Sequence, residues 1–243
     1  MTGWILPHET QKGYLEACQR AATDDESFSE FRSKPPLLSI WGHIQGDEGQ
    51  EYFDAIIAEG HIARWAMDEI VEMNNIGSPH VFSCDGMILS PTAFRYLYVV
   101  SGLMSLPKQS APLSIIEVGG GYGGLAATAK KFLDVEDYTI VDFHEAGLLQ
   151  QRYLRECDID DVTTLRAETF ECHLKDKYDV FISNYSLDEF NEPTQERYIQ
   201  HVVSRCRHGY VTVNIDKDRL RDLLPCTDSY PEPGNCHPEV MRW

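Results

Sequence analysis

The sequence predicts an α/β protein whose mostly parallel sheet is covered by helices on both faces, the doubly wound arrangement. Two observations support this prediction. After residue 110, short apolar runs alternate with helical stretches, a pattern that indicates parallel strands joined by right-handed crossovers. The first apolar run ends in five glycines within the six positions 119–124, where a strand would turn into a helix. We therefore expect a helical region over 1–110 and the sheet over 111–243.

The helical region is predicted from residue spacing and from proline. Apolar residues three and four apart over 48–73 indicate one or two amphipathic helices with a break near Gly60. Pro91 suits the first turn of a helix over 91–104. The remaining stretches predict an acidic connector at 24–30, a loop at 74–79 and a short extended piece at 81–84. We expect this region to cap the crevice of the sheet as a lid.

The sheet region is predicted as five strands and three helices. The strands are expected at 113–118, 138–143, 162–165, 178–183 and 210–215, and the helices at 122–132, 145–156 and 194–206. Doubly wound sheets bind ligands beyond the carboxyl ends of their strands, where the strand order reverses. Functional residues are therefore expected directly after each predicted strand.

The charge and composition of the chain limit the classes of partner that it is expected to bind. The formal net charge of −18 over 243 residues disfavours a nucleic-acid partner, because a phosphate backbone would be repelled over most of the surface. No segment approaches the roughly 18 continuous apolar residues of a membrane span, and the N-terminus shows no secretory pattern. We expect a cytoplasmic protein with a small-molecule partner and no membrane association.

Seven cysteines, an odd number with no CxxC pair, indicate free thiols in a reducing compartment. Cys226, Cys236 and His237 are the nearest approach to a metal-ligand cluster, but they lack a second close pair. A divalent metal is not predicted.

The glycine-rich stretch fits two templates. Gly119, Gly121 and Gly124 have the GxGxxG spacing of dinucleotide-binding folds, whereas Glu117, Gly119, Gly121 and Gly123 read as ExGxGxG. Asp142 ends the next strand, where a carboxylate accepts ribose hydroxyls in either case. Glu117 distinguishes the templates, because a carboxylate beside a pyrophosphate is repulsive while it favours the ammonium and sulfonium of S-adenosylmethionine.

In these residues the chain resembles the class I S-adenosylmethionine-dependent methyltransferases, and more narrowly the sugar O-methyltransferase family of surface-polysaccharide gene sets. The broad resemblance rests on 117–123 and Asp142. The narrower one rests on Ser90-Pro-Thr-Ala-Phe-Arg95, the loop 77–79, the segments 179–189 and 207–214, and the close from Glu232 to Trp243. The resemblance covers about residue 74 to the C-terminus. It implies a Rossmann-like core, S-adenosylmethionine as cofactor, a sugar or glycoconjugate acceptor, and a last strand that returns to the sheet.

Cofactor contacts are expected at the carboxyl ends of four strands. We assign to them Glu117, Gly119, Gly120, Gly121, Gly123, Asp142, Phe143, Glu168, Asn184 and Tyr185. Glu168 follows the third strand, where it would meet the adenine amino group, although a solvated acidic loop is the simpler interpretation.

Methyl transfer to a hydroxyl needs a positioned base, because a sugar hydroxyl is a weak acid. Glu189 is our first candidate and Asp188 the second, while Ser186-x-x-Glu189 also fits a capping box that would give Glu189 a purely structural role. His43, His80 and His144 are rival bases, although a lone histidine is more often structural.

Acceptor contacts are expected from His80, Arg95 and Trp41, which lie in or beside the helical region. Two other functions stay open at this point. One is a nicotinamide-dependent oxidoreductase, disfavoured by Glu117. The other is a non-catalytic binding module, disfavoured because packing alone does not require Glu117, Gly119, Gly121 and Asp142 together.

Overall fold

The computed structural model describes residues 4–5, 7–42, 44, 46–107, 112–234 and 238–243. Within this part of the chain, seven strands form one sheet in the order β5-β4-β3-β6-β7-β9-β8. The five parallel strands are β3 (Leu113–Val118), β4 (Val135–Asp142), β5 (Val162–Arg166), β6 (Tyr178–Asn184) and β7 (Cys206–Val213). The last two, β9 (Glu239–Arg242) and β8 (Asp228–Pro231), are antiparallel to their neighbours.

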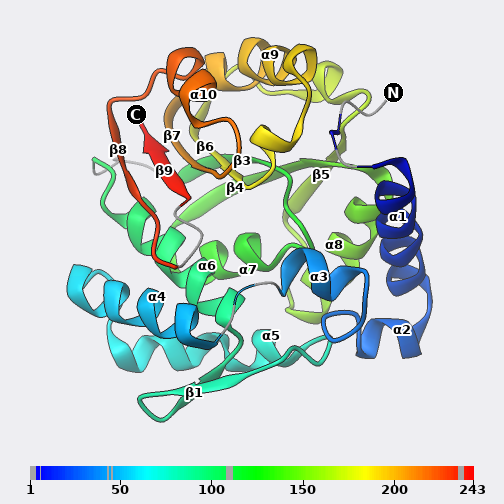
Figure 1. Ribbon diagram of the computed structural model, residues 1–243, viewed down its shortest axis with the longest axis vertical. Helices are drawn as coiled ribbons and strands as arrows, with labels where there is room; N and C mark the ends of the chain where they lie inside the picture. Colours follow the sequence, from blue (N-terminus) through cyan, green and yellow to red (C-terminus); the bar gives the residue numbers. More distant parts are fainter. Residues whose placement is uncertain (1–3, 6, 43, 45, 108–111, 235–237) are drawn as a thin grey trace.

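Helices cover both faces of the sheet, which confirms the doubly wound prediction. One face carries α6 (Pro91–Met104), α7 (Gly124–Phe132) and α8 (His144–Glu156), and the other carries α9 (Glu192–His201) and α10 (Lys217–Leu223) (Figure 1). The order of the strands reverses between β3 and β6. The carboxyl ends of these strands are therefore where a doubly wound sheet opens a crevice.

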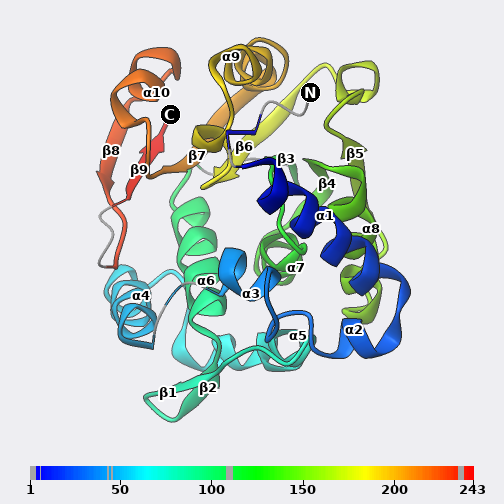
Figure 2. The same ribbon diagram turned by 45° about the vertical axis from the view of Figure 1, so that its right-hand side comes forward.

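The first ninety residues add an outer layer on one side. It consists of α1 (His8–Thr23), α2 (Asp25–Ser29), α3 (Leu37–Trp41), α4 (Gly46–Glu59), η1 (Arg64–Ile70), α5 (Val71–Asn75) and the hairpin β1 (Phe82–Cys84) with β2 (Met87–Leu89). Figure 2 shows α1 beside α8 and α4 beside α6.

This outer layer and the sheet share one apolar cluster. Tyr14 of α1 and Ile56 of α4 belong to the same buried group as Leu97 of α6 and Ile115 of β3. The helical layer is therefore packed on the sheet through buried side chains and stabilised by the removal of apolar surface from water.

Several predicted boundaries match the structure. The helix predicted at 91–104 is α6, with Ser90 as its N-cap and Pro91 in its first turn. α4 ends at Glu59, before Gly60 with its φ of +70°, as the predicted break requires. The returning last strand is β9.

Other predictions were wrong for local reasons. The stretch 24–30 is not a plain connector, because Asp24 accepts a hydrogen bond from the Ser27 amide (2.7 Å) and so caps the short helix α2. The helix predicted at 194–206 ends at His201, and Cys206 already begins β7. The strands β2 and β8 and the helix α10 were not predicted, because each is too short to show a hydrophobic period.

Candidate functional site

The glycine loop connects β3 to α7 in a conformation that requires glycine. Gly119, Gly121 and Gly123 have φ values of +81°, +56° and +92°. A Cβ atom at Gly119 would lie 2.2 Å from the Ser186 Oγ, so the loop packs directly against the chain that follows β6. Gly119, Gly120 and Gly121 line the crevice, where the absence of side chains lets a ligand approach the loop backbone closely.

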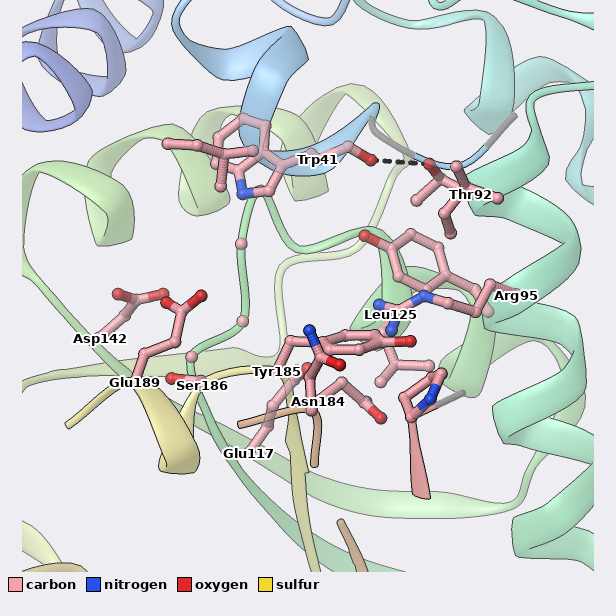
Figure 3. A pocket seen from close by; sticks show the side chains of 18 of the residues that line it. Trp41, Thr92, Arg95, Glu117, Leu125, Asp142, Asn184, Tyr185, Ser186 and Glu189 are labelled. Atoms are coloured by element: carbon pink, nitrogen blue, oxygen red, sulfur yellow. Dashed lines mark hydrogen bonds between the residues drawn. The ribbon is translucent and has the colours of Figure 1, made fainter. Parts of the chain in front are cut away.

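A cavity of about 380 Å³ lies over this loop at the carboxyl ends of β3, β4 and β6 (Figure 3). The sheet contributes its floor, and the N-terminal layer contributes its other walls through Trp4, Tyr14, Trp41 and Tyr52. Of the residues assigned from sequence, those on its walls are Glu117, Gly119, Gly120, Gly121, Asp142, Phe143, Asn184, Tyr185, Glu189, Arg95 and Trp41. The volume is within the range of small-molecule sites.

Asp142 is held in place at the end of β4. It is 8% exposed, and its two oxygen atoms accept hydrogen bonds of 2.8 Å from the Phe143 amide and from the Gln150 side chain. The Gln150 amide nitrogen also donates to the Gly121 carbonyl oxygen (3.0 Å) and so connects Asp142 to the glycine loop. Burial raises the pKa of Asp142 to about 7.

Glu117 lies beneath the loop and is 2% exposed. The Tyr138 hydroxyl donates to its Oε2 at 2.9 Å. Burial raises the pKa of Glu117 to about 8, against the lowering effect of the Tyr138 hydrogen bond. A nearby positive charge would favour its ionised form.

Glu189 faces the cavity and is held in place by hydrogen bonds from the N-terminal segment. The Trp4 indole nitrogen donates to the Glu189 Oε2 (2.8 Å), and the Ile5 amide donates to the Glu189 carbonyl oxygen (2.8 Å). Ser186 makes no side-chain cap at this point, so the structure does not show the capping-box arrangement. Burial raises the pKa of Glu189 to about 7, so it can accept a proton near neutral pH.

Asp188 is placed differently from its neighbour Glu189. It is 2% exposed, and its Oδ2 accepts hydrogen bonds from the amides of Asn214 (2.7 Å) and Ile215 (2.9 Å). These bonds tie the short helix η3 (Leu187–Glu189) to the chain after β7. Asp188 is not on the wall of the cavity.

The remaining sequence candidates lie outside this cavity. His144 approaches the Arg166 side chain (3.5 Å), and Glu168 is exposed, while its neighbour Ala167 lines the cavity. His80 is exposed and lines a second cavity of about 500 Å³ on the far side of Trp41. Gly123 supports the turn against Leu154 of α8. His43, Cys236 and His237 lie outside the described residues.

The sequence did not point to three residues that shape this site. Trp4 lines the cavity from the N-terminal segment, and Gln150 of α8 donates a hydrogen bond to Asp142. Glu232 accepts a hydrogen bond from the Tyr185 hydroxyl across 47 positions of sequence. No local sequence pattern predicts contacts between such distant segments.

The described part of the chain contains no group of three or more His, Cys, Asp or Glu side chains arranged to hold a metal ion. None of its helices is both long and apolar enough to cross a membrane.

Comparison with known proteins adds information on the fold. No family model and no curated protein matches the sequence. Among solved structures, TrmN from Thermus thermophilus superposes with a TM-score of 0.50 at 14% identity, over 60% of this chain and 47% of the TrmN chain. A ribosomal protein L11 methylase from Lactobacillus delbrueckii subsp. bulgaricus gives 0.48 at 14% identity, over 67% and 79%. The [4+2]-cyclase SpnF gives 0.49 at 17% identity, over 62% and 64%.

The chain has a Rossmann-like methyltransferase fold. The strand order, with an antiparallel β9 inserted between β7 and β8, agrees with this fold. At these low identities the likeness extends to the fold alone, and this chain spans less than half of TrmN.

Proposed function

We propose that this protein is an S-adenosylmethionine-dependent O-methyltransferase that acts on a hydroxyl of a sugar or of a sugar-containing small molecule. The observation that supports it most is the pair of buried carboxyl groups, Glu117 and Asp142, on one cavity with the glycine loop. The cavity walls carry acidic side chains at the ends of both β3 and β4. Such walls suit a cationic nucleoside and disfavour a pyrophosphate.

The cofactor contacts follow from these positions. Asp142 would accept the two ribose hydroxyls, and Phe143 and Ala167 would contact the adenine. Glu117 would face the positively charged amino-acid end, while the glycine loop lets that end approach the backbone. The residue after β5 that would contact the adenine is therefore Ala167, which lines the cavity, in place of Glu168.

Glu189 is the proposed general base. The bound cofactor supplies an electrophilic methyl group on its sulfonium. Glu189 would accept a hydrogen bond from the acceptor hydroxyl and take its proton as the oxygen receives the methyl group. The ionised fraction of Glu189 near pH 7 is large enough for this role, because its pKa is about 7.

The acceptor would enter between the sheet and the N-terminal layer, which we propose to act as a lid over 1–110. Trp41 and Tyr52 offer aromatic surfaces there, and Asn214 offers polar atoms at the end of β7. Both kinds of contact suit a sugar. The net charge of −18 supports a small-molecule acceptor over a nucleic acid.

Calorimetry with S-adenosylhomocysteine tests the cofactor assignment. We expect micromolar binding that is lost in Gly121→Arg, because an arginine at φ +56° beside the Trp41 indole would fill the space above the loop. Absence of binding, or tight NADH binding with fluorescence enhancement, would reject a methyl donor in favour of an oxidoreductase.

Transfer of labelled methyl groups to a panel of sugars and glycoconjugates tests the reaction. Cofactor binding without transfer to any acceptor, and with Glu189→Ala equal to wild type in every assay but stability, would instead indicate a non-catalytic binding module.

A further inference from the structure

The charges around the main cavity are uneven. Among the described residues that line it, Arg95 carries the only positive charge, whereas Glu48, Glu117, Asp142 and Glu189 are acidic. A single buried cation on an otherwise acidic wall identifies where an anionic group of a ligand would be held.

Arg95 reaches the cavity from α6 and is 7% exposed. Its Nε and Nη1 atoms have no hydrogen-bond partner, and in the described chain it forms no ion pair within 4.0 Å. Glu232 is the acidic group that acts most strongly on it, from beyond ion-pair distance. A buried guanidinium with unused donors is unfavourable without a ligand, so it is an unusual choice for a purely structural position.

The backbone beneath Arg95 is also strained. The guanidinium carbon lies 4.7 Å from the centre of the Tyr185 ring, and Tyr185 has a φ of +56°. Figure 3 shows the Arg95 side chain over this ring. A non-glycine residue in the left-handed region is strained. This conformation places the Tyr185 ring as a platform under the cation. The Asn184 Nδ2 beside it is a further buried donor with no partner.

Glu117 lies close enough to Arg95 for the two charges to interact, since Arg95 favours the ionised form of Glu117. The cavity therefore presents a cation and a carboxylate near the glycine loop. Their ligand counterpart is a zwitterion, with an anionic and a cationic group a few ångströms apart. An α-amino acid has this pattern.

We propose that Arg95 binds the carboxylate, and Glu117 the ammonium, of the amino-acid end of S-adenosylmethionine. This inference rests on the proposed function and deepens it. It reassigns Arg95 from the acceptor to the cofactor. The acceptor side of the cavity is then left without a cation among the described residues.

Wild-type protein and two ligands provide the first test. Calorimetry compares S-adenosylhomocysteine with its decarboxylated analogue, which keeps the adenosine, the sulfur and the amine. Loss of a charge-assisted hydrogen bond predicts that the analogue binds at least about tenfold more weakly. Equal affinities would overturn the inference, whereas failure of both ligands to bind would overturn the proposed function itself.

Arg95→Met provides the second test, since methionine keeps much of the contact with the Tyr185 ring. In this variant the two ligands should bind within about threefold of each other, because the group that distinguishes them is gone. Asp142→Asn is the matched control. It should weaken the binding of both ligands alike and leave the ratio of their affinities at the wild-type value. Circular dichroism checks folding, and Arg95→Lys, which keeps the charge, serves if Arg95→Met does not fold.

An undiminished ligand ratio in Arg95→Met would assign Arg95 to another role, whether in acceptor binding or in packing. The same conclusion would follow if Asp142→Asn abolished the difference in affinity between the two ligands as fully as Arg95→Met does.

Discussion

At the scale of single residues, the cavity holds carboxyl groups whose hydrogen bonds offset only part of the cost of burying their charge. The pKa values of Glu117, Asp142 and Glu189 are all raised, mainly by burial. A group of this kind favours folding in its neutral form and binding in its ionised form. Function at this site is therefore expected to oppose stability.

Glu117→Gln should make this opposition measurable. The folded-state pKa of about 8 lies above the ordinary value of 4.5, so the protonated form stabilises the fold at low pH, and that contribution is lost as pH rises through 8. Glutamine does not titrate and can still accept the Tyr138 hydrogen bond. We expect the free energy of unfolding of the variant, relative to that of wild type, to rise by roughly 1–3 kcal/mol from pH 5 to pH 9. Denaturant unfolding at both pH values measures this change. A difference independent of pH would argue against a buried, neutral Glu117.

Glu189→Gln should separate catalysis from binding. We expect kcat to fall by about 10²–10⁴ while S-adenosylhomocysteine affinity stays within about threefold. In wild type, activity should rise with pH through about 7, because the base must be ionised. This rising limb should be absent from the residual activity of the variant. A variant that keeps the same limb and rate would exclude Glu189 as the base.

At the scale of secondary-structure elements, the two adjacent acidic residues after β6, Asp188 and Glu189, have different roles. Glu189 turns toward the cavity and the N-terminus, and Asp188 turns toward the end of β7. The sequence predicted the importance of this segment but not the division, because adjacent positions in a short 3₁₀ turn point in directions that only packing decides.

Asp188→Ala should therefore affect stability and leave chemistry intact. Removing an acceptor of two buried amide donors predicts a loss of about 2–4 kcal/mol in the free energy of unfolding. Thermal unfolding measures this loss. Under conditions where the variant is folded, S-adenosylhomocysteine affinity should match wild type, and a selective loss of kcat would instead restore Asp188 as a candidate base.

The N-terminal segment is the second element with a measurable role. Trp4→Phe removes the indole N–H that favours ionised Glu189, while an aromatic ring stays against Tyr14 and Phe143. The pKa of Glu189 should then rise above about 7, and the rising limb of the pH–rate profile should move to higher pH by about half a unit or more. An unmoved profile would mean that Trp4 contributes packing alone.

At the scale of the whole molecule, much of the sheet could be predicted and the cavity only in part. Strands such as 113–118 and the loop after them have strong local signals, namely apolar runs and clustered glycine. Trp4 at Glu189 is a contact across 185 positions, and Glu232 at Tyr185 is another between distant segments. These depend on how the N-terminal layer packs on the sheet, which residue spacing does not encode.

The distribution of charge over the cavity predicts acceptor preference. With Arg95 engaged by the cofactor, the acceptor meets acidic walls and no cation among the described residues. A neutral glycoside should be methylated at least about tenfold more efficiently, by kcat/KM, than the same glycoside carrying a phosphate. A preference for the phosphorylated acceptor would contradict this distribution of roles.

The proposed function requires a methyl donor in the cavity above the glycine loop. A crystal structure of the protein with S-adenosylhomocysteine tests this claim most directly. We predict the ribose hydroxyls within hydrogen-bond distance of Asp142, the adenine against Phe143, the amino-acid carboxylate on Arg95, and the sulfur facing the side that carries Glu189. A ligand bound elsewhere, or a ribose directed away from Asp142, would contradict the proposed function.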